Sequence, residues 1–192
     1  MSTTAPRRTP PPTIDDYLCL EEASPIKHDY VAGEIYALAG ASARHNRIAG
    51  NIFAQLWAAA GDGPCQVYGS DMRLRIGDAA VYYPDVQVVC DPSDTEESFK
   101  TCPCVIVEVL SPSTESIDLR EKWLVYNRLE CLQAYIIVYR DQMRVLRHYR
   151  AENNAWFSAL HAGPEDKIPF PCPEVELTFG DIYRGLAPTA AG

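Results

Sequence analysis

The sequence has no long hydrophobic run, and this absence limits where the chain can reside. None of its apolar stretches approaches the about 20 residues that a membrane-spanning helix needs, so we expect no membrane segment. The first residues also lack an apolar stretch and carry prolines at positions 6, 10, 11 and 12. This pattern differs from a signal peptide and predicts an extended, disordered lead over residues 1–12. We therefore expect a cytoplasmic protein.

A cysteine framework is missing as well. The seven cysteines are an odd number, and their positions (19, 65, 90, 102, 104, 131 and 172) match no disulfide scaffold. Cys102 and Cys104 form a C-x-C pair, but the sequence lacks a second cysteine pair or clustered histidines to complete a zinc site. In a cytoplasmic protein we expect reduced thiols that serve as small core residues.

Positive charge is scarce. The chain has 17 Lys and Arg residues against 26 Asp and Glu residues, and its net charge of -9 argues against a generally basic nucleic-acid-binding surface. The acids concentrate in one region, because residues 85–121 hold nine of them against one lysine and one arginine. Bound cations would offset part of this negative charge.

The composition that remains is that of an ordinary globular protein. The chain has 192 residues, 47% of them hydrophobic, which suits one domain with a substantial core. We place this domain at residues 13–186 and expect a flexible tail over residues 187–192. No internal repeat or domain linker divides it.

The spacing of apolar residues predicts alternating helices and strands. Helices should begin after Thr13 and after Ser42, since both residues are good N-caps. Two continuous apolar runs, at 104–110 and 134–139, predict buried strands. A third helix between them should extend to about Glu130. Together these elements predict a right-handed parallel crossover. The expected fold class is α/β, a mixed sheet flanked by helices. Further expected elements are short strands within 28–38, strands at 65–68, 72–76, 143–149 and 155–160, and a helical turn within 177–186.

Two acids lie inside apolar segments that are about twenty residues apart. Asp85 follows Pro84 in the run 81–91, and Glu108 lies within the run 104–110. A carboxylate in a buried strand is costly unless it is paired, hydrogen-bonded or bound to a metal. Two such acids on neighbouring strands are a candidate site for Mg²⁺ or Mn²⁺. Lys122, on the following helix, could orient the attacking water and neutralise a phosphate.

Several short motifs accompany these acids in a fixed order over roughly residues 13–150. They are Gly33-Glu34-Ile35, His45, Gly69 to Arg73, Pro84-Asp85-Val86, Val107 to Thr114, Asp118, Lys122 and Tyr126. Together they resemble the Uma-two family of restriction-endonuclease-like proteins, within the PD-(D/E)XK nuclease superfamily. The combination is far more specific than any single motif.

The resemblance implies a restriction-endonuclease-like fold, a divalent metal and a phosphodiester substrate. It implies that Asp85 and Glu108 are metal ligands and that a metal-activated water attacks the phosphate. It also makes Glu34 and His45 candidates for supporting roles near the metal. The partners expected on this basis are DNA and a second copy of the chain, since most oligomers are cyclic dimers.

One position departs from the superfamily pattern. The superfamily usually keeps a lysine two residues after the strand glutamate, where this chain has Leu110. In the resembled family this lysine is displaced to the helix, where it corresponds to Lys122. An alternative interpretation pairs Lys122 with Asp118, one helical turn earlier, in an ion pair worth only about 0.3–0.5 kcal/mol. The sequence leaves both interpretations open.

Other candidate residues also have simpler interpretations. Arg73 and Arg75 alternate with apolar residues, so they either contact substrate phosphate or form a solvated strand face. Asp85 could pair with one of them or accept a local hydrogen bond. We interpret Tyr126, like the other tyrosines near the acids, as a core aromatic residue.

Three functions fit these observations. The first is a metal-dependent endonuclease that hydrolyses DNA. The second is a catalytically silent binding protein on the same fold, which Leu110 and the negative net charge favour. The third is a metal hydrolase of small phosphate esters. For the endonuclease, replacing Asp85 or Glu108 by alanine should abolish metal-dependent cleavage while leaving the fold intact. Either change should also raise the thermal stability of the metal-free protein, because it removes one of two like charges.

Overall fold

The computed structural model describes residues 10–110 and 117–187, without the side chains of residues 117 and 118. The helical elements are α1 (Ile14–Ala23), α2 (Ala43–Ala60), a π-helical segment η1 (Ile117–Glu121), α3 (Lys122–Tyr126) and α4 (Phe179–Ile182). The strands are β1 (His28–Val31), β2 (Glu34–Ala37), β3 (Gln66–Gly69), β4 (Arg73–Ile76), β5 (Ala80–Tyr82), β6 (Val86–Val89), β7 (Phe99–Lys100), β8 (Val105–Leu110), β9 (Ala134–Tyr139), β10 (Val145–Arg150), β11 (Trp156–His161), β12 (Lys167–Pro171) and β13 (Glu174–Thr178).

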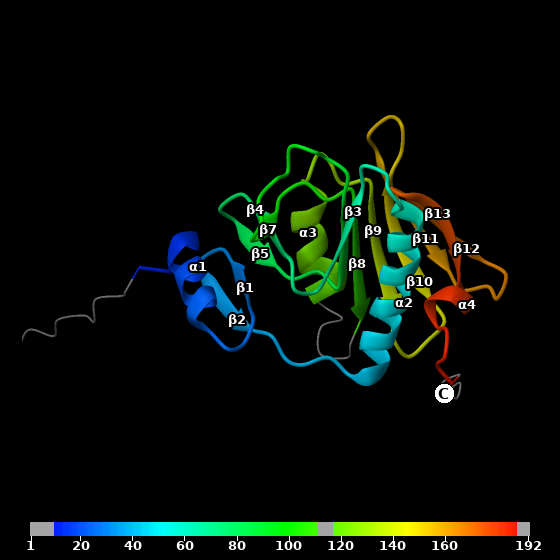
Figure 1. The fold of residues 1–192 in the computed structure, drawn as a ribbon, viewed down its shortest axis with the longest axis horizontal. Helices are drawn as coiled ribbons and strands as arrows, with labels where there is room; N and C mark the ends of the chain where they lie inside the picture. Colours follow the sequence, from blue (N-terminus) through cyan, green and yellow to red (C-terminus); the bar gives the residue numbers. More distant parts are fainter. Residues whose placement is uncertain (1–9, 111–116, 188–192) are drawn as a thin grey trace, which may run out of the picture.

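The described residues form an α/β structure built on two larger sheets and a hairpin. The central sheet has the strand order β11-β10-β9-β8-β6-β3, and the outer sheet has the order β2-β1-β5-β4-β7. Figure 1 shows the outer sheet and α1 to one side of the central sheet, while the β12–β13 hairpin and α4 lie on the other side. The expected mixed sheet is confirmed, because β8 and β9 are parallel while β6 and β8 are antiparallel.

The two faces of the central sheet are covered by different helices. Successive side chains of a strand point to opposite faces. On β8, Val105, Val107 and Val109 therefore pack in one cluster with residues of α2. Ile106 and Leu110 pack in a second cluster with Tyr126 of α3. Glu108 lies between Ile106 and Leu110 in this alternation, so its side chain faces α3.

The N-terminal elements form as the sequence predicts. The Thr13 side chain accepts a hydrogen bond from the Asp16 backbone N–H, and Asp16 caps Thr13 in return, which fixes the start of α1. β1 and β2 form a hairpin whose turn residues, Ala32 and Gly33, have φ of 49° and 90°. A Cβ at Gly33 would lie 2.8 Å from the Cβ of Pro11, so this turn requires glycine.

Three features of the fold differ from expectation. The run 81–91 does not form one strand, because Pro84 lacks a backbone N–H and separates β5 of the outer sheet from β6 of the central sheet. The third helix ends at Tyr126 rather than near Glu130, and its first part is π-helical. The β12–β13 hairpin was not predicted, since Pro169 and Pro171 lower the strand signal.

The helices of the described residues bear on the expectation that the chain has no membrane segment. α2 has 18 residues, and none of the helices within residues 10–110 and 117–187 combines the length and apolarity needed to cross a membrane. The start of α1 at Ile14 is compatible with a domain beginning at residue 13. The domain boundaries themselves stay predictions.

The expectation of separate reduced thiols is wrong for four cysteines. Disulfide bonds join Cys65 to Cys90 and Cys104 to Cys172. Cys65 and Cys90 flank the paired strands β3 and β6, where the register places them opposite each other. The sequence did not reveal this grouping because pairing depends on which strands are neighbours in space.

The buried imidazole of His148 should make stability depend on pH. His148 lies on β10 and stacks on Trp123 at 4.2 Å between ring centroids. Its Nε2 is buried and has no hydrogen-bond partner within residues 10–110 and 117–187. Burial lowers the pKa of His148 below its ordinary value of 6.5. Its neutral form therefore contributes stability above pH 6.5 that is lost as pH falls through the lower folded-state pKa.

His148→Phe tests this dependence, because phenylalanine keeps the ring but cannot be protonated. The free energy of unfolding, measured by urea titration at several pH values, should fall less steeply with decreasing pH in the variant than in the parent protein. Identical slopes in the two proteins would contradict the assignment to His148.

Candidate active site

Asp85, just before β6, and Glu108, within β8, belong to two neighbouring strands of the central sheet. β6 and β8 are antiparallel, with Val86 opposite Val107. The next position of this register places Asp85 opposite Glu108. One oxygen of the Asp85 carboxylate, Oδ2, accepts a hydrogen bond of 2.8 Å from the backbone N–H of Val109, which ties Asp85 directly to the strand that carries Glu108.

His45 completes the surroundings of Asp85. Ser42 caps α2 by accepting a hydrogen bond from the backbone N–H of His45, so His45 lies in the first turn of the helix. The Nε2 of His45 lies 2.8 Å from Oδ1 of Asp85. Both side chains are about one-seventh exposed, which leaves the pair at the protein surface. Each carboxylate oxygen has a further lone pair, so Asp85 can still bind a cation.

Glu108 is held by two groups of α3. Its Oε1 lies 2.8 Å from Nζ of Lys122 and accepts a hydrogen bond of 3.1 Å from the hydroxyl of Tyr126. Glu108 and Lys122 are only 4% and 7% exposed. Burial, together with the Glu108 carboxylate, raises the pKa of Tyr126 well above its usual range, so this hydroxyl stays protonated and donates.

Lys122 thus contacts one of the two acids, as the displaced-lysine interpretation requires. Its ammonium group also lies 5.5 Å from the centre of the Tyr82 ring. The alternative partner, Asp118, has a side chain outside the described part of the chain, as do residues 111–114 of the long signature.

Glu34 occupies a different position. It lies on β2, the edge strand of the outer sheet, and its exposed carboxylate accepts a hydrogen bond from the hydroxyl of Tyr36. This hydrogen bond raises the pKa of Tyr36. The contact stays within β2, so the supporting role of Glu34 near the metal stays a prediction.

Arg73 and Arg75 are engaged within the outer sheet. Arg73 donates to the backbone carbonyl of Ser98 at 3.0 Å, while its Nη1 is buried and has no hydrogen-bond partner among the described residues. Arg75 donates to the carboxylate of Asp78 at 2.9 Å. Asp85 is bound by His45 instead of by either arginine. The predicted phosphate contacts of the two arginines stay predictions.

The carboxylates suit a cation that keeps most of its water. Within residues 10–110 and 117–187, a group of three His, Cys, Asp or Glu ligand atoms lying within 4.8 Å of one another occurs only among cysteines. Asp85, Glu108 and His45 therefore do not form such a compact set. Mg²⁺ is commonly held by one or two carboxylates and several waters, and this donor set fits that chemistry.

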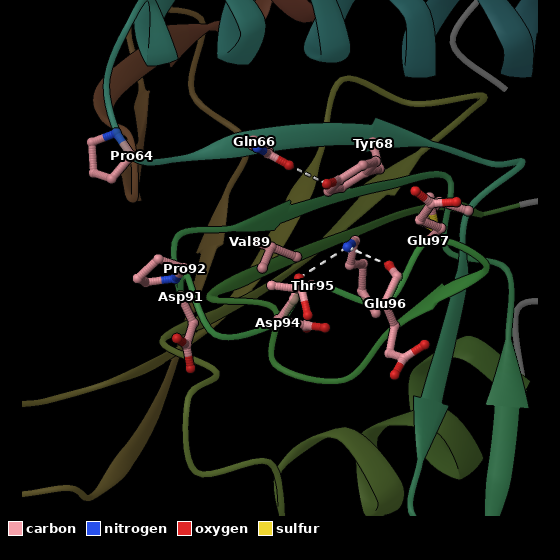
Figure 2. A pocket seen from close by; sticks show the side chains of 12 residues that line it. Pro64, Gln66, Tyr68, Val89, Asp91, Pro92, Asp94, Thr95, Glu96 and Glu97 are labelled. Atoms are coloured by element: carbon pink, nitrogen blue, oxygen red, sulfur yellow. Dashed lines mark hydrogen bonds between the residues drawn. The ribbon is translucent and has the colours of Figure 1, made fainter.

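The hollow drawn in Figure 2 is not part of this site. It has a volume of about 530 Å³ and lies between β3 and the loop that follows β6. Lys100 bridges this loop by donating to the backbone carbonyls of Asp94 and Glu96. Val89 lines the hollow, whereas Asp85 precedes the other end of β6. The hollow and the acid pair therefore belong to opposite ends of the strand.

Tyr126 is the site residue whose role sequence reasoning missed. We interpreted it as a core aromatic, and its ring does pack edge-on against Tyr135 at 5.1 Å between centroids. Its hydroxyl nevertheless binds Glu108. The available signal was its spacing, because residues four apart, such as Lys122 and Tyr126, lie on the same side of a helix.

Comparisons with known proteins identify a family and relatives of this chain. A family model, Uma2, described as "Putative restriction endonuclease", matches residues 14–179. Two relatives from Synechocystis are the uncharacterized proteins slr1290 and sll1609. The first is 33% identical over 90% of this chain and 92% of its own length, and the second is 33% identical over 82% and 92%.

A solved structure shares the fold. The crystal structure of a "putative nuclease belonging to DUF820" from Anabaena variabilis covers 90% of this chain and 98% of its own, with a TM-score of 0.70. At 18% identity this likeness shows the fold, which is restriction-endonuclease-like. The family match extends over most of the chain and includes both acids, so the chain belongs to the Uma2 family.

Proposed function

We propose that the protein is a metal-dependent endonuclease that hydrolyses DNA phosphodiester bonds. The observation that carries the proposal is that Asp85 and Glu108 come to facing positions on two neighbouring strands, with the Lys122 ammonium 2.8 Å from Glu108. The description of the family and of the Anabaena protein supports it. The proposal includes a homodimer, because cutting both strands of a duplex suits a two-fold assembly. It also includes a cytoplasmic location.

Each residue of the site would have a separate role in catalysis. Asp85 and Glu108 would hold Mg²⁺ or Mn²⁺, which supplies an activated water and offsets charge on the phosphate. His45 holds one oxygen of Asp85 and so fixes the direction of the other. Lys122 places a positive charge beside Glu108, where it would neutralise a phosphate oxygen. Tyr126 restrains the Glu108 carboxylate from the same helix.

A catalytically silent binding protein is the second candidate, and the burial of Glu108 favours it. In this structure Oε1 of Glu108 is occupied by both Lys122 and Tyr126, and only 4% of the residue is exposed. Leu110 stands where the superfamily usually keeps its lysine. An acidic protein must also overcome repulsion from DNA unless one face is locally basic.

Calorimetric titration of Mn²⁺ into the protein, with and without a short DNA duplex, tests the proposal. We expect saturable binding that Asp85→Asn removes, because the amide oxygen carries no charge. Asp62→Asn is the matched control. This exposed acid lies beyond the far end of α2, and the helix from His45 to Ala60 is about 22 Å long.

The outcomes separate the candidates. Binding lost only in Asp85→Asn, together with DNA cleavage, supports the endonuclease. Metal binding with hydrolysis of a small phosphate ester but not of DNA would favour the phosphate-ester hydrolase. If neither condition shows binding, even in the presence of DNA, the metal site is refuted and the silent binding protein is preferred.

A further inference from the structure

Cysteines from distant parts of the chain converge at one place in the fold. Cys65 precedes β3, Cys90 follows β6 and Cys104 precedes β8, while Cys172 lies in the turn between β12 and β13. Two disulfides pair them, as described above, and Sγ of Cys90 lies 3.3 Å from Sγ of Cys104 across the two pairs. The sulfurs of Cys90, Cys104 and Cys172 all lie within 4.8 Å of one another. We call Cys65, Cys90, Cys104 and Cys172 the cysteine cluster.

The contact between the Cys65–Cys90 and Cys104–Cys172 disulfides indicates a candidate metal site. Two disulfides that act separately have no need to touch, whereas the ligands of a metal must all surround one point. The number and type of sulfur atoms are those of a Cys₄ zinc site. With Zn–S bonds of about 2.3 Å, a tetrahedral site separates its sulfurs by about 3.8 Å. This value lies between the 3.3 Å that separates the sulfurs of Cys90 and Cys104 and the 4.8 Å within which those of Cys90, Cys104 and Cys172 all lie. Cys65, joined to Cys90, would supply the fourth sulfur.

We propose that the cysteine cluster, in its reduced state, is a tetrathiolate site for Zn²⁺. A dithiol reductant would convert the two disulfides to four thiols by transferring two electrons and two protons to each. Binding of Zn²⁺ would then displace the four thiol protons. The site is chemically distinct from the Asp85–Glu108 pair, because thiolates select soft metals and carboxylates select Mg²⁺ or Mn²⁺.

The location of the cluster gives the metal a structural role. Cys90 and Cys104 lie at the ends of β6 and β8 that are opposite to Asp85 and Glu108. Cys172 belongs to the hairpin that packs on the central sheet through Phe170 and Leu177. A bound ion would therefore join the hairpin and β3 to the two strands that carry the acids. This inference does not depend on nuclease activity.

Titration of Co²⁺ into the phosphine-reduced full-length protein tests the proposal. Cobalt in a tetrahedral tetrathiolate site gives an intense charge-transfer band and visible absorption that oxygen ligands do not give. We expect saturation at about one equivalent and displacement by Zn²⁺. Cys172→Ser should abolish the signal, whereas Cys19→Ser should keep it, because Cys19 is exposed and outside the cluster.

A second measurement keeps the test decisive if Cys172→Ser fails to fold. Alkylation of the reduced parent protein, read by mass spectrometry, should modify all seven cysteines without metal. With Zn²⁺ present, only Cys19, Cys102 and Cys131 should react under native conditions. Absence of the cobalt signal, or a signal unchanged in folded Cys172→Ser, would overturn the proposal, as would equal alkylation with and without zinc.

Discussion

Replacing Asp85 by asparagine should lower the rate of Mg²⁺-dependent DNA cleavage by roughly 10³-fold, which corresponds to about 4 kcal/mol of transition-state stabilisation. The reason is electrostatic, because an amide oxygen binds a hard cation much more weakly than a carboxylate does. The loss should appear in the initial rate at which supercoiled plasmid is converted to open-circular and linear forms.

The fold of this variant should survive. The side-chain oxygen of asparagine can still accept the hydrogen bond from the Val109 backbone N–H that Asp85 accepts in the parent protein. Asp62→Asn should cut at the parent rate, which controls for the change in net charge. An Asp85→Asn protein that cleaves as fast as the parent would show that this acid is not a metal ligand.

Replacing Lys122 by methionine should lower the free energy of unfolding by about 3–5 kcal/mol, the usual cost of removing one partner of a buried ion pair. The carboxylate of Glu108 is 5% exposed and the side chain of Lys122 is 9% exposed, so neither charge is well hydrated in the folded protein. Urea titration followed by circular dichroism measures the loss directly.

The double variant Lys122→Met with Glu108→Gln should be more stable than Lys122→Met alone, because no charge is then left unpaired. Gln at position 108 can still accept the hydrogen bond that Tyr126 donates in the parent. A double variant that is no more stable than Lys122→Met would mean that the two side chains do not stabilise each other in solution.

For the stability of the metal-free protein, the structure and the sequence predict opposite effects of alanine at Asp85 or Glu108. Two like-charged acids on neighbouring strands suggested that alanine at either position would stabilise the metal-free protein. The structure shows Glu108 compensated by Lys122, so Glu108→Ala would instead leave a buried ammonium without this partner. Asp85→Ala would likewise remove the acceptor of the Val109 N–H.

Local features of the fold were predictable because they depend on neighbouring residues. Thr13 and Ser42 begin α1 and α2 through side-chain hydrogen bonds to backbone N–H groups three residues later. Gly33 allows the positive φ of the first hairpin. The apolar run around Glu108 forms a central strand buried on both faces, as continuous hydrophobicity predicts.

Contacts between distant segments were not predictable in the same way. The bond between His45 and Asp85 spans 40 positions, and the Cys104–Cys172 pair spans 68. No local spacing encodes such pairs, because they arise only when β3, β6, β8 and α2 take their places around the central sheet. The split of one apolar run into two sheets at Pro84 likewise depends on which strands accept its two halves as neighbours.

Periodicity and residue type were enough to predict the mixed α/β class, the family motifs and the two acids on buried segments. The packing of the folded chain was needed to show that Lys122 lies against Glu108, that Glu34 lies on the edge of the outer sheet, and that the sulfurs of Cys90, Cys104 and Cys172 lie within 4.8 Å of one another. The physical reason is that burial and pairing depend on the packing of whole elements, which a linear pattern does not contain.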